Sequence, residues 1–99
     1  MELTLTDAAL SDLQSIRAYT LETWGEEQEE KYLDEMWNRF EEILAHPQRW
    51  RSRHDLFPGC QLAPQGKHII LFSIEGDTLQ LVRVFHSAMD FPRQVAEDL

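Results

Sequence analysis

The sequence predicts an α+β domain built from one strand, two helices and then three strands. Two observations predict this order. Apolar residues recur at helical spacing through the first half of the chain, whereas in the second half they alternate or run continuously, as they do in strands. The 99 residues are expected to form a single domain, residues 1–99, because so short a chain cannot build two cores.

The first strand and the first helix follow from residues 2–25. Glu2 to Leu5 alternate polar and apolar side chains, which predicts a short strand. Thr6 has the side chain of a helix N-cap, and Gly25 suits the left-handed conformation that often ends a helix. Between them an apolar stripe predicts a helix from residue 7 to about residue 23, formed by Ala9, Leu13, Ile16 and Thr20.

The second helix begins with acidic residues, which the positive end of the helix dipole favours. These residues are Glu26, Glu27, Glu29 and Glu30. They are read as a solvated face, with an acidic partner-binding patch as the alternative. One apolar face follows, formed by Leu33, Met36, Trp37, Phe40, Ile43 and Leu44, and Pro47 ends the helix. The two helices therefore form a helical hairpin.

The second half reads as a loop followed by three strands. Residues 46–59 have no sustained period and are bounded by prolines, so they form a connecting loop. Strands are predicted at residues 60–63, 68–74 and 78–85, and the turn at residues 75–77 pairs the last two as an antiparallel hairpin. The strand 68–74 is apolar on both faces, so it is central, with helices on one side and another element on the other.

Composition and charge exclude several classes of protein. The net charge is −9, and residues 1–45 carry 3 basic against 12 acidic side chains, which disfavours binding of duplex DNA by this chain alone. No apolar run approaches the ~20 residues of a membrane span, and no signal peptide is visible, so no membrane contact and a cytoplasmic location are expected. The single cysteine, Cys60, forms no zinc motif, and no metal or cofactor is expected.

The loop carries a group of positive charges. Arg49, Arg51 and Arg53 alternate with Trp50 and Ser52, so in an extended segment the arginines could project together and hold a phosphate or a carboxylate. The alternative is that they balance the acidic second helix.

Several segments, taken in order, resemble one known family over nearly the whole chain. They are Leu5-Thr6 with Ala9, Asp12-Leu13 and Ile16; Tyr19 with Trp24-Gly25; Pro58-Gly59; Gly66 to Phe72; and Arg83 to His86 followed by Asp90. In order and spacing these segments resemble the ParE branch of the RelE/ParE superfamily of toxins. The resemblance implies a bacterial type II toxin with a cognate antitoxin, and a helical hairpin packed on a small curved antiparallel sheet.

Two activities are compatible with that resemblance. ParE toxins typically inhibit DNA gyrase by binding it, whereas RelE toxins cut messenger RNA on the ribosome. A nuclease needs an acid, a base and a cation at the phosphate, for which Arg53, Lys67, Arg83 and His86 are the candidates, with His68 as a further one. The strongly acidic chain fits that chemistry poorly, so a protein-binding inhibitor is favoured over an endoribonuclease. A non-toxic module that binds an antitoxin is a third reading.

The residues expected to contact a target or an antitoxin lie on the loop and at the end of the last strand. They are Arg49, Arg51, Arg53, His68, Arg83, His86 and Asp90. Three of these have structural alternatives: a hydrogen-bonded histidine for His68, an ion pair for Arg83 and a turn cap for Asp90. The segment Ser87-Ala88-Met89 departs from the family pattern because it supplies no positive charge. The tail after Pro92 is either a short helix or a frayed end.

Overall fold

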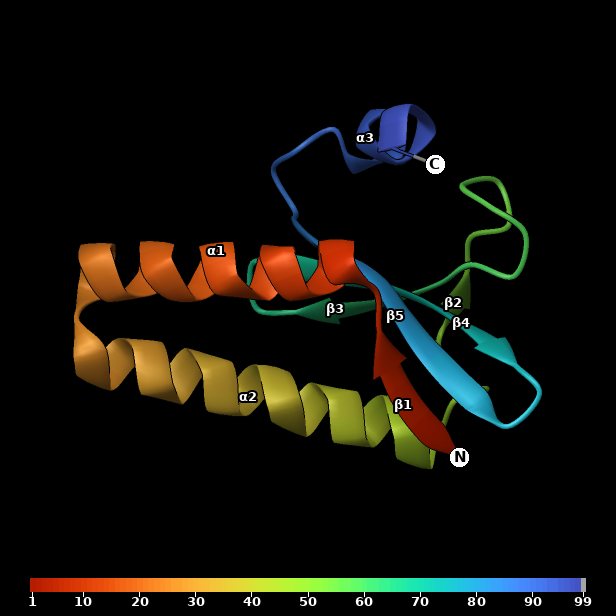
Figure 1. The fold of residues 1–99 in the computed structure, drawn as a ribbon, viewed down its shortest axis with the longest axis horizontal. Coiled ribbons are helices and arrows are strands. Elements are labelled where there is room, and N and C mark those ends of the chain that lie inside the picture. Colours follow the sequence, from red (N-terminus) through yellow and green to blue (C-terminus); the bar gives the residue numbers. More distant parts are fainter. Residues whose placement is uncertain (99) are drawn as a thin grey trace.

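The computed structural model describes residues 1–98, which form three layers: a helical hairpin, a five-stranded sheet and a C-terminal helix (Figure 1). The elements are β1 (Glu2–Leu5), α1 (Asp7–Trp24), α2 (Glu26–Ala45), β2 (Arg51–Ser52), β3 (Gln61–Gln65), β4 (His68–Glu75), β5 (Thr78–His86) and α3 (Phe91–Asp98). The predicted α+β fold and order of elements are confirmed. The predicted domain and tail reach Leu99, which lies outside the described residues.

The helical hairpin has the ends that the sequence predicts. Thr6 is the N-cap of α1, and its Oγ1 accepts a hydrogen bond from the backbone N–H of Ala9 at 3.0 Å. Gly25, with φ of 93°, separates α1 from α2, and its N–H donates to the carbonyl of Leu21. Because one residue joins the helices, they lie side by side and present their apolar stripes to the same layer.

The sheet has the strand order β1-β5-β4-β3-β2. The strands from β5 to β2 pair in an antiparallel manner, and β1 joins β5 in parallel at the edge. The sequence predicts only a loop over residues 46–59, whereas the structure has β2 within it, with Arg51 opposite Leu62. A strand of two residues is too short to leave a detectable alternation in the sequence.

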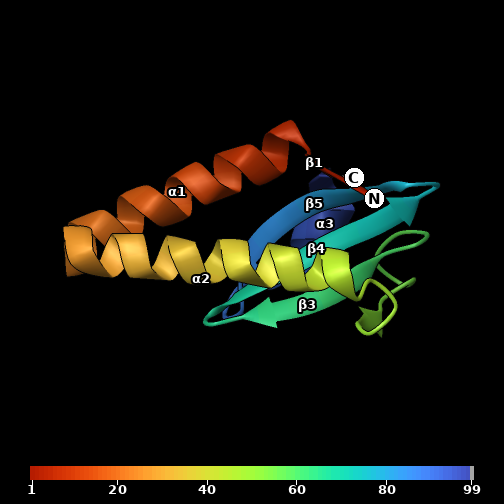
Figure 2. The same ribbon diagram turned by 90° about the horizontal axis from the view of Figure 1, so that it is seen from below.

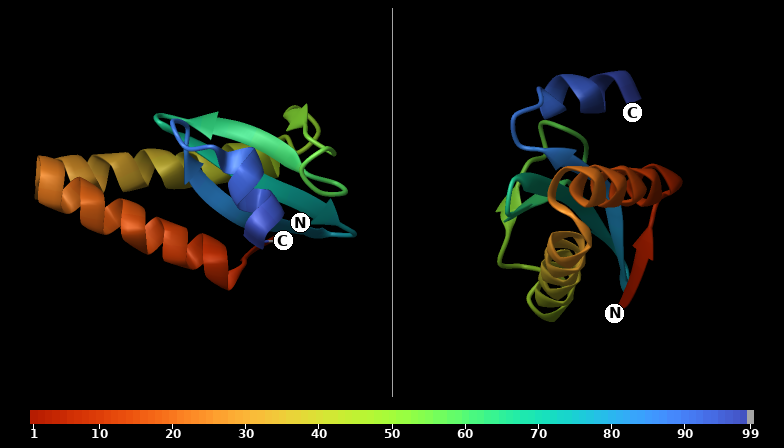
Figure 3. Two further views of the ribbon diagram at one scale, coloured as in Figure 1. Left: turned by 90° about the horizontal axis from the view of Figure 1, so that it is seen from above. Right: turned by 90° about the vertical axis from the view of Figure 1, so that its left-hand side faces the viewer.

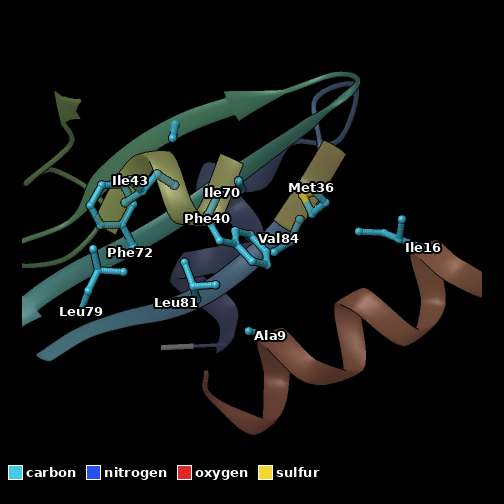
Figure 4. Packing of buried hydrophobic residues seen from close by; sticks show 11 residues of the cluster. Ala9, Ile16, Met36, Phe40, Ile43, Ile70, Phe72, Leu79, Leu81 and Val84 are labelled. Carbon is cyan, nitrogen blue, oxygen red and sulfur yellow. The ribbon is translucent and has the colours of Figure 1, made fainter. Parts of the chain in front are cut away.

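The main core lies between the helical hairpin and one face of the sheet (Figure 4). It contains Ile16 from α1, Met36 and Phe40 from α2, and Ile70 and Phe72 from β4, most of them fully buried. A smaller cluster covers the other face, formed by Cys60, Leu71, Phe85 and Val95. Figures 2 and 3 show α2 and α3 on opposite sides of the sheet. The element expected to cover the second face of the central strand is therefore α3, together with the loop before β3.

Candidate functional site

The C-terminal half of β5 has an edge that β1 does not cover, because the pairing with β1 ends at Leu81. Residues of α1 and its cap take over the backbone groups there. The Thr6 hydroxyl donates to the carbonyl of Val82 at 2.7 Å, and the N–H of Val84 donates to Asp12 Oδ2 at 2.9 Å. The start of α1 therefore closes an edge that is otherwise open to pairing with another chain.

Asp12 also binds Arg83, one of the two arginines that the sequence offers as candidates for a phosphate. Arg83 donates from Nε to Asp12 Oδ2 at 2.8 Å and from Nη2 to Oδ1 at 2.9 Å, and each side chain is only 15% exposed. The guanidinium also lies 4.4 Å from the ring centroid of Phe85. Arg83 therefore forms the ion pair that was its structural alternative, and the carboxylate of Asp12 balances its charge.

Arg53 forms a second fork of this kind. It donates from Nε and Nη2 to the two carboxylate oxygens of Asp55, both at 2.9 Å, and this bond holds the pKa of Asp55 below its ordinary value. Its guanidinium lies 5.8 Å from the ring of Phe91, the first residue of α3. Two cations that a nuclease would direct at a phosphate are therefore each engaged by a carboxylate.

The other two loop arginines have different surroundings. Arg49 is exposed and stacks on Trp50 at 5.5 Å, while Arg39 of α2 stacks on the same ring at 5.3 Å. Trp50 packs against the main core, whereas Phe91, which Arg53 contacts, packs against the cluster on the other face of the sheet. Arg51 is exposed in β2. The arginines of residues 49–53 accordingly do not converge on one ligand.

His68 lies at the start of β4, where it contacts Tyr32 of α2. The hydroxyl of Tyr32 shares a hydrogen bond with His68 Nδ1 and donates to the carbonyl of Gln65 at 3.2 Å. Burial, together with the neighbouring His86 ring at 5.3 Å, lowers the pKa of His68 from 6.5 to about 4. Burial also raises the pKa of Tyr32, so both groups are neutral at physiological pH. The structural alternative for His68 therefore fits its contacts.

Gly66 makes the close approach of Tyr32 possible. It lies in the turn between β3 and β4 with φ of +57°, a conformation that side chains with a Cβ rarely adopt. A Cβ at this position would lie 2.8 Å from the Tyr32 hydroxyl oxygen. The turn that contains the predicted site residue Lys67 and precedes His68 is thus held by a ring from α2.

Two of the exposed candidates, Lys67 and His86, lie at one end of the sheet. His68 is the direct partner of His86 in the β4–β5 register, and the N–H of Ser87 donates to the carbonyl of Lys67 at 2.8 Å. The side chains of Lys67 and His86 are both exposed there. His86 Nδ1 accepts from the N–H of Ala88 at 3.0 Å, which leaves Nε2 directed away from that turn. This end of the sheet therefore presents both an accessible imidazole and an accessible ammonium group.

Asp90 follows that turn and begins α3. Its Oδ1 accepts from the N–H of Arg93 at 3.5 Å, the long limit of a hydrogen bond, so the capping alternative has a structural basis. The helix that it begins is anchored by Val95, which is 1% exposed, and by stacking of Phe91 on Phe85. Of the two readings of the tail, the helical one matches residues 91–98.

Sequence reasoning missed Asp12 and Tyr32 as partners of the site. A signal existed for Asp12, which stands three residues after Ala9, beside the apolar stripe of α1. No signal linked Tyr32 to His68, because they are 36 residues apart. Within residues 1–98 no group of three or more His, Cys, Asp or Glu side chains is placed to hold a metal ion. None of the helices in the same residues is long and apolar enough to cross a membrane.

Comparison with known proteins gives one consistent family. The family model of the ParE toxin of the type II toxin-antitoxin system parDE matches residues 3–91. Toxin ParE1 of Mycobacterium tuberculosis (strain H37Rv) is 32% identical over 92 residues, which cover 92% of this chain and 94% of the relative. Toxin ParE1 of Caulobacter vibrioides is 29% identical over 86 residues, covering 87% and 88%.

Two solved structures share the fold. A chain of the chromosomal ParDE system from P. aeruginosa superposes with a TM-score of 0.74 at 19% identity, covering 87% of this chain and 95% of that one. A chain of the RelBE2 toxin-antitoxin complex from Mycobacterium tuberculosis superposes with a TM-score of 0.56 at 22% identity, covering 86% and 95%. The family match ends at Phe91, so nearly all of α3 lies beyond it.

Proposed function

Because the chain belongs to the ParE toxin family of type II toxin-antitoxin systems, we propose that it inhibits DNA gyrase by binding it and that a cognate antitoxin neutralises it. A toxin with this target acts in the cytoplasm, where gyrase meets the chromosome. The proposal separates two activities within one superfamily: inhibition through a protein–protein contact, and cleavage of messenger RNA.

One observation carries the choice between them. Arg83 and Arg53 are each held by both oxygens of a carboxylate, and burial keeps His68 neutral. A ribonuclease stabilises the growing negative charge on the phosphate with cations that are free to approach it. With a net charge of −9 and these two guanidinium groups engaged, the chain is poorly suited to that step and better suited to binding a protein.

The remaining site residues are proposed as contacts to the target or to the antitoxin. Lys67 and His86 are both exposed at the same end of the sheet, and Arg51 is exposed in β2. Exposed polar and charged side chains at an interface contribute mainly to orientation and to the rate of association. Arg83, Arg53, His68 and Asp90 then act by holding the surface in shape.

Expression of the chain without an antitoxin tests the proposal. We expect arrest of growth, broken chromosomal DNA and intact messenger RNA. The His86→Ala variant removes an exposed ring that accepts a hydrogen bond from Ala88 and contacts the ring of His68, and circular dichroism checks that the variant is folded. Normal growth with a demonstrably folded protein contradicts the proposal and favours a non-toxic antitoxin-binding module.

A second candidate function is a ribosome-dependent endoribonuclease. It is favoured by the presence of an accessible imidazole, His86, and an accessible ammonium group, Lys67, at the same end of the sheet. This candidate predicts site-specific breaks in messenger RNA that disappear in His86→Ala. Under the gyrase proposal the same variant leaves the messages intact, as they are with the unchanged chain.

A further inference from the structure

The helical hairpin carries most of the exposed large apolar side chains of the described residues. Seven such side chains are exposed in residues 1–98, and five of them lie on α1 or α2: Leu10, Tyr19, Leu21, Trp24 and Trp37. The end of the hairpin near Gly25 extends beyond the sheet (Figure 2). Concentrated apolar surface on a small domain marks a place where another molecule binds.

Part of this surface forms an open groove of about 630 Å³ between α1 and α2. Its apolar lining consists of Leu21, Leu33 and Trp37. Trp37 is 46% exposed, and its ring packs edge-on against the buried Phe40 with the centroids 5.0 Å apart. The core therefore holds the Trp37 ring in place before a partner binds. Less side-chain entropy is then lost on binding.

The same groove is strongly acidic. Its lining includes the carboxylates of Glu26, Glu29, Glu30 and Asp34, against the single guanidinium of Arg17. Arg17 is the ion-pair partner of Glu29 at 2.8 Å, but its own side chain is 70% exposed while that of Glu29 is 10% exposed. The arginine balances only one of the four carboxylates, so the groove keeps a net negative charge.

The spacing of these residues suits a helical occupant. On α2 the acidic Glu26, Glu30 and Asp34 follow one another at intervals of four, and Leu33 and Trp37 do the same beside them. The acidic row therefore extends along residues 26–34, a length of about 12 Å, and the apolar pair lies beside its C-terminal end, with Leu21 of α1 also lining the groove. A partner helix of about three turns can place apolar side chains against this apolar part of the groove and basic side chains along the acidic row.

We propose that this groove binds a basic amphipathic helix of a partner protein. Charge complementarity selects this occupant, because four carboxylates against one cation favour Lys and Arg and repel an acidic segment or a nucleic acid. A second copy of the chain is disfavoured, since each copy carries a net charge of −9. The proposal concerns the outer groove of the hairpin and does not depend on gyrase being the target.

Binding of a synthetic peptide to the full chain tests the proposal. The probe is a helical peptide of about 18 residues with Leu at intervals of three and four and Lys at the other positions, and its counterpart has Glu in place of Lys. Fluorescence anisotropy of labelled peptide, at about 150 mM salt, is expected to detect the Lys peptide and not the Glu peptide. The indole resonance of Trp37 is expected to shift in NMR spectra when the Lys peptide binds.

Variants show whether the groove is the site. Trp37→Ala and Leu21→Ala are each expected to weaken binding of the Lys peptide about tenfold, because each removes an apolar contact. Two variants are used so that the test still holds if one of them misfolds. Glu30→Gln with Asp34→Asn is expected to weaken it about fivefold. The matched control, Glu2→Gln with Glu75→Gln, removes the same charge from exposed positions on β1 and β4 and is expected to change it less than about twofold.

Three results would overturn the proposal. One is equal weakening by the groove and control variants, which would mean that only net charge attracts the peptide. Another is binding of the Glu peptide as tightly as the Lys peptide. The third is a dimer of the chain in light scattering that Trp37→Ala dissociates, which would make a second copy the occupant.

Discussion

The closed edge of β5 depends on the Asp12 carboxylate. In Asp12→Ala the guanidinium of Arg83 loses two charge-assisted hydrogen bonds and the N–H of Val84 loses its acceptor. Both side chains of the pair are 15% exposed, so water replaces these bonds only in part. Loss of one partner of a largely buried pair lowers the free energy of unfolding by about 3 kcal/mol, a large fraction of a small domain's stability.

A series of variants separates the three bonds. Asp12→Asn keeps an acceptor for Val84 but loses the charge, so a decrease of about 1.5 kcal/mol is expected. Arg83→Ala leaves the bond to Val84 in place and is expected to cost about 2 kcal/mol. Because the two residues interact, the double variant is expected to cost less than the sum of the single variants by about 1.5 kcal/mol.

Urea unfolding followed by circular dichroism at pH 7 measures these differences. The matched control is Glu41→Ala, an exposed carboxylate on α2, expected to change stability by less than about 0.5 kcal/mol. A loss below about 1 kcal/mol in Asp12→Ala, or additive single and double variants, would refute the reasoning that Asp12 both closes the edge and neutralises Arg83.

Three further predictions concern the turn, the half-buried His68 and the cysteine. Gly66→Ala is expected to lower the free energy of unfolding by about 2 to 3 kcal/mol, because the added Cβ meets the Tyr32 hydroxyl. The control is Gly76→Ala, where φ is +58° and the space around the Cβ is open, and it is expected to lower that free energy by about 1 kcal/mol. Equal losses in urea unfolding would contradict the contact with Tyr32. The pKa of His68 is lowered from 6.5 to about 4, so the unfolded chain binds a proton more readily; its contribution of about 3 kcal/mol is fully present above pH 6.5 and is lost as the pH falls toward 4. His68→Gln is expected to flatten this part of the pH profile of stability, and an unchanged profile would count against the assignment. Burial raises the pKa of the Cys60 thiol to about 11, so alkylation at pH 8 is expected to be slow in the native protein and rapid in denaturant, and equal rates would contradict the burial.

Much of the fold was predictable because its elements are long and periodic. The stripe from Ala9 to Thr20 and the face from Met36 to Ile43 occur at helical spacing, and Ile70 to Phe72 form a continuous apolar run. Each of these patterns reflects burial against the same core, so local preference and tertiary packing agree. The two-residue strand β2 escaped prediction because its formation depends on the partner strand β3 and not on its own sequence.

The site was less predictable because its contacts join distant parts of the chain. Arg83 was identified as a candidate, but its partner Asp12 is 71 residues away and belongs to a helix. His68 was identified as well, but its neutral state depends on burial and on the ring of His86, the direct partner of His68 in the β4–β5 register. Sequence shows which side chains are available, and the structure shows which of them are already engaged.

The supercoiling activity of purified gyrase, measured with and without the purified chain, tests the central proposal most directly. No ribosomes or messenger RNA are present, so RNA cleavage cannot contribute to the result. We predict inhibition at near-stoichiometric amounts of the chain, with trapped and cleaved DNA, and relief when the cognate antitoxin is added. Unchanged supercoiling by a sample shown to be folded would contradict the gyrase proposal.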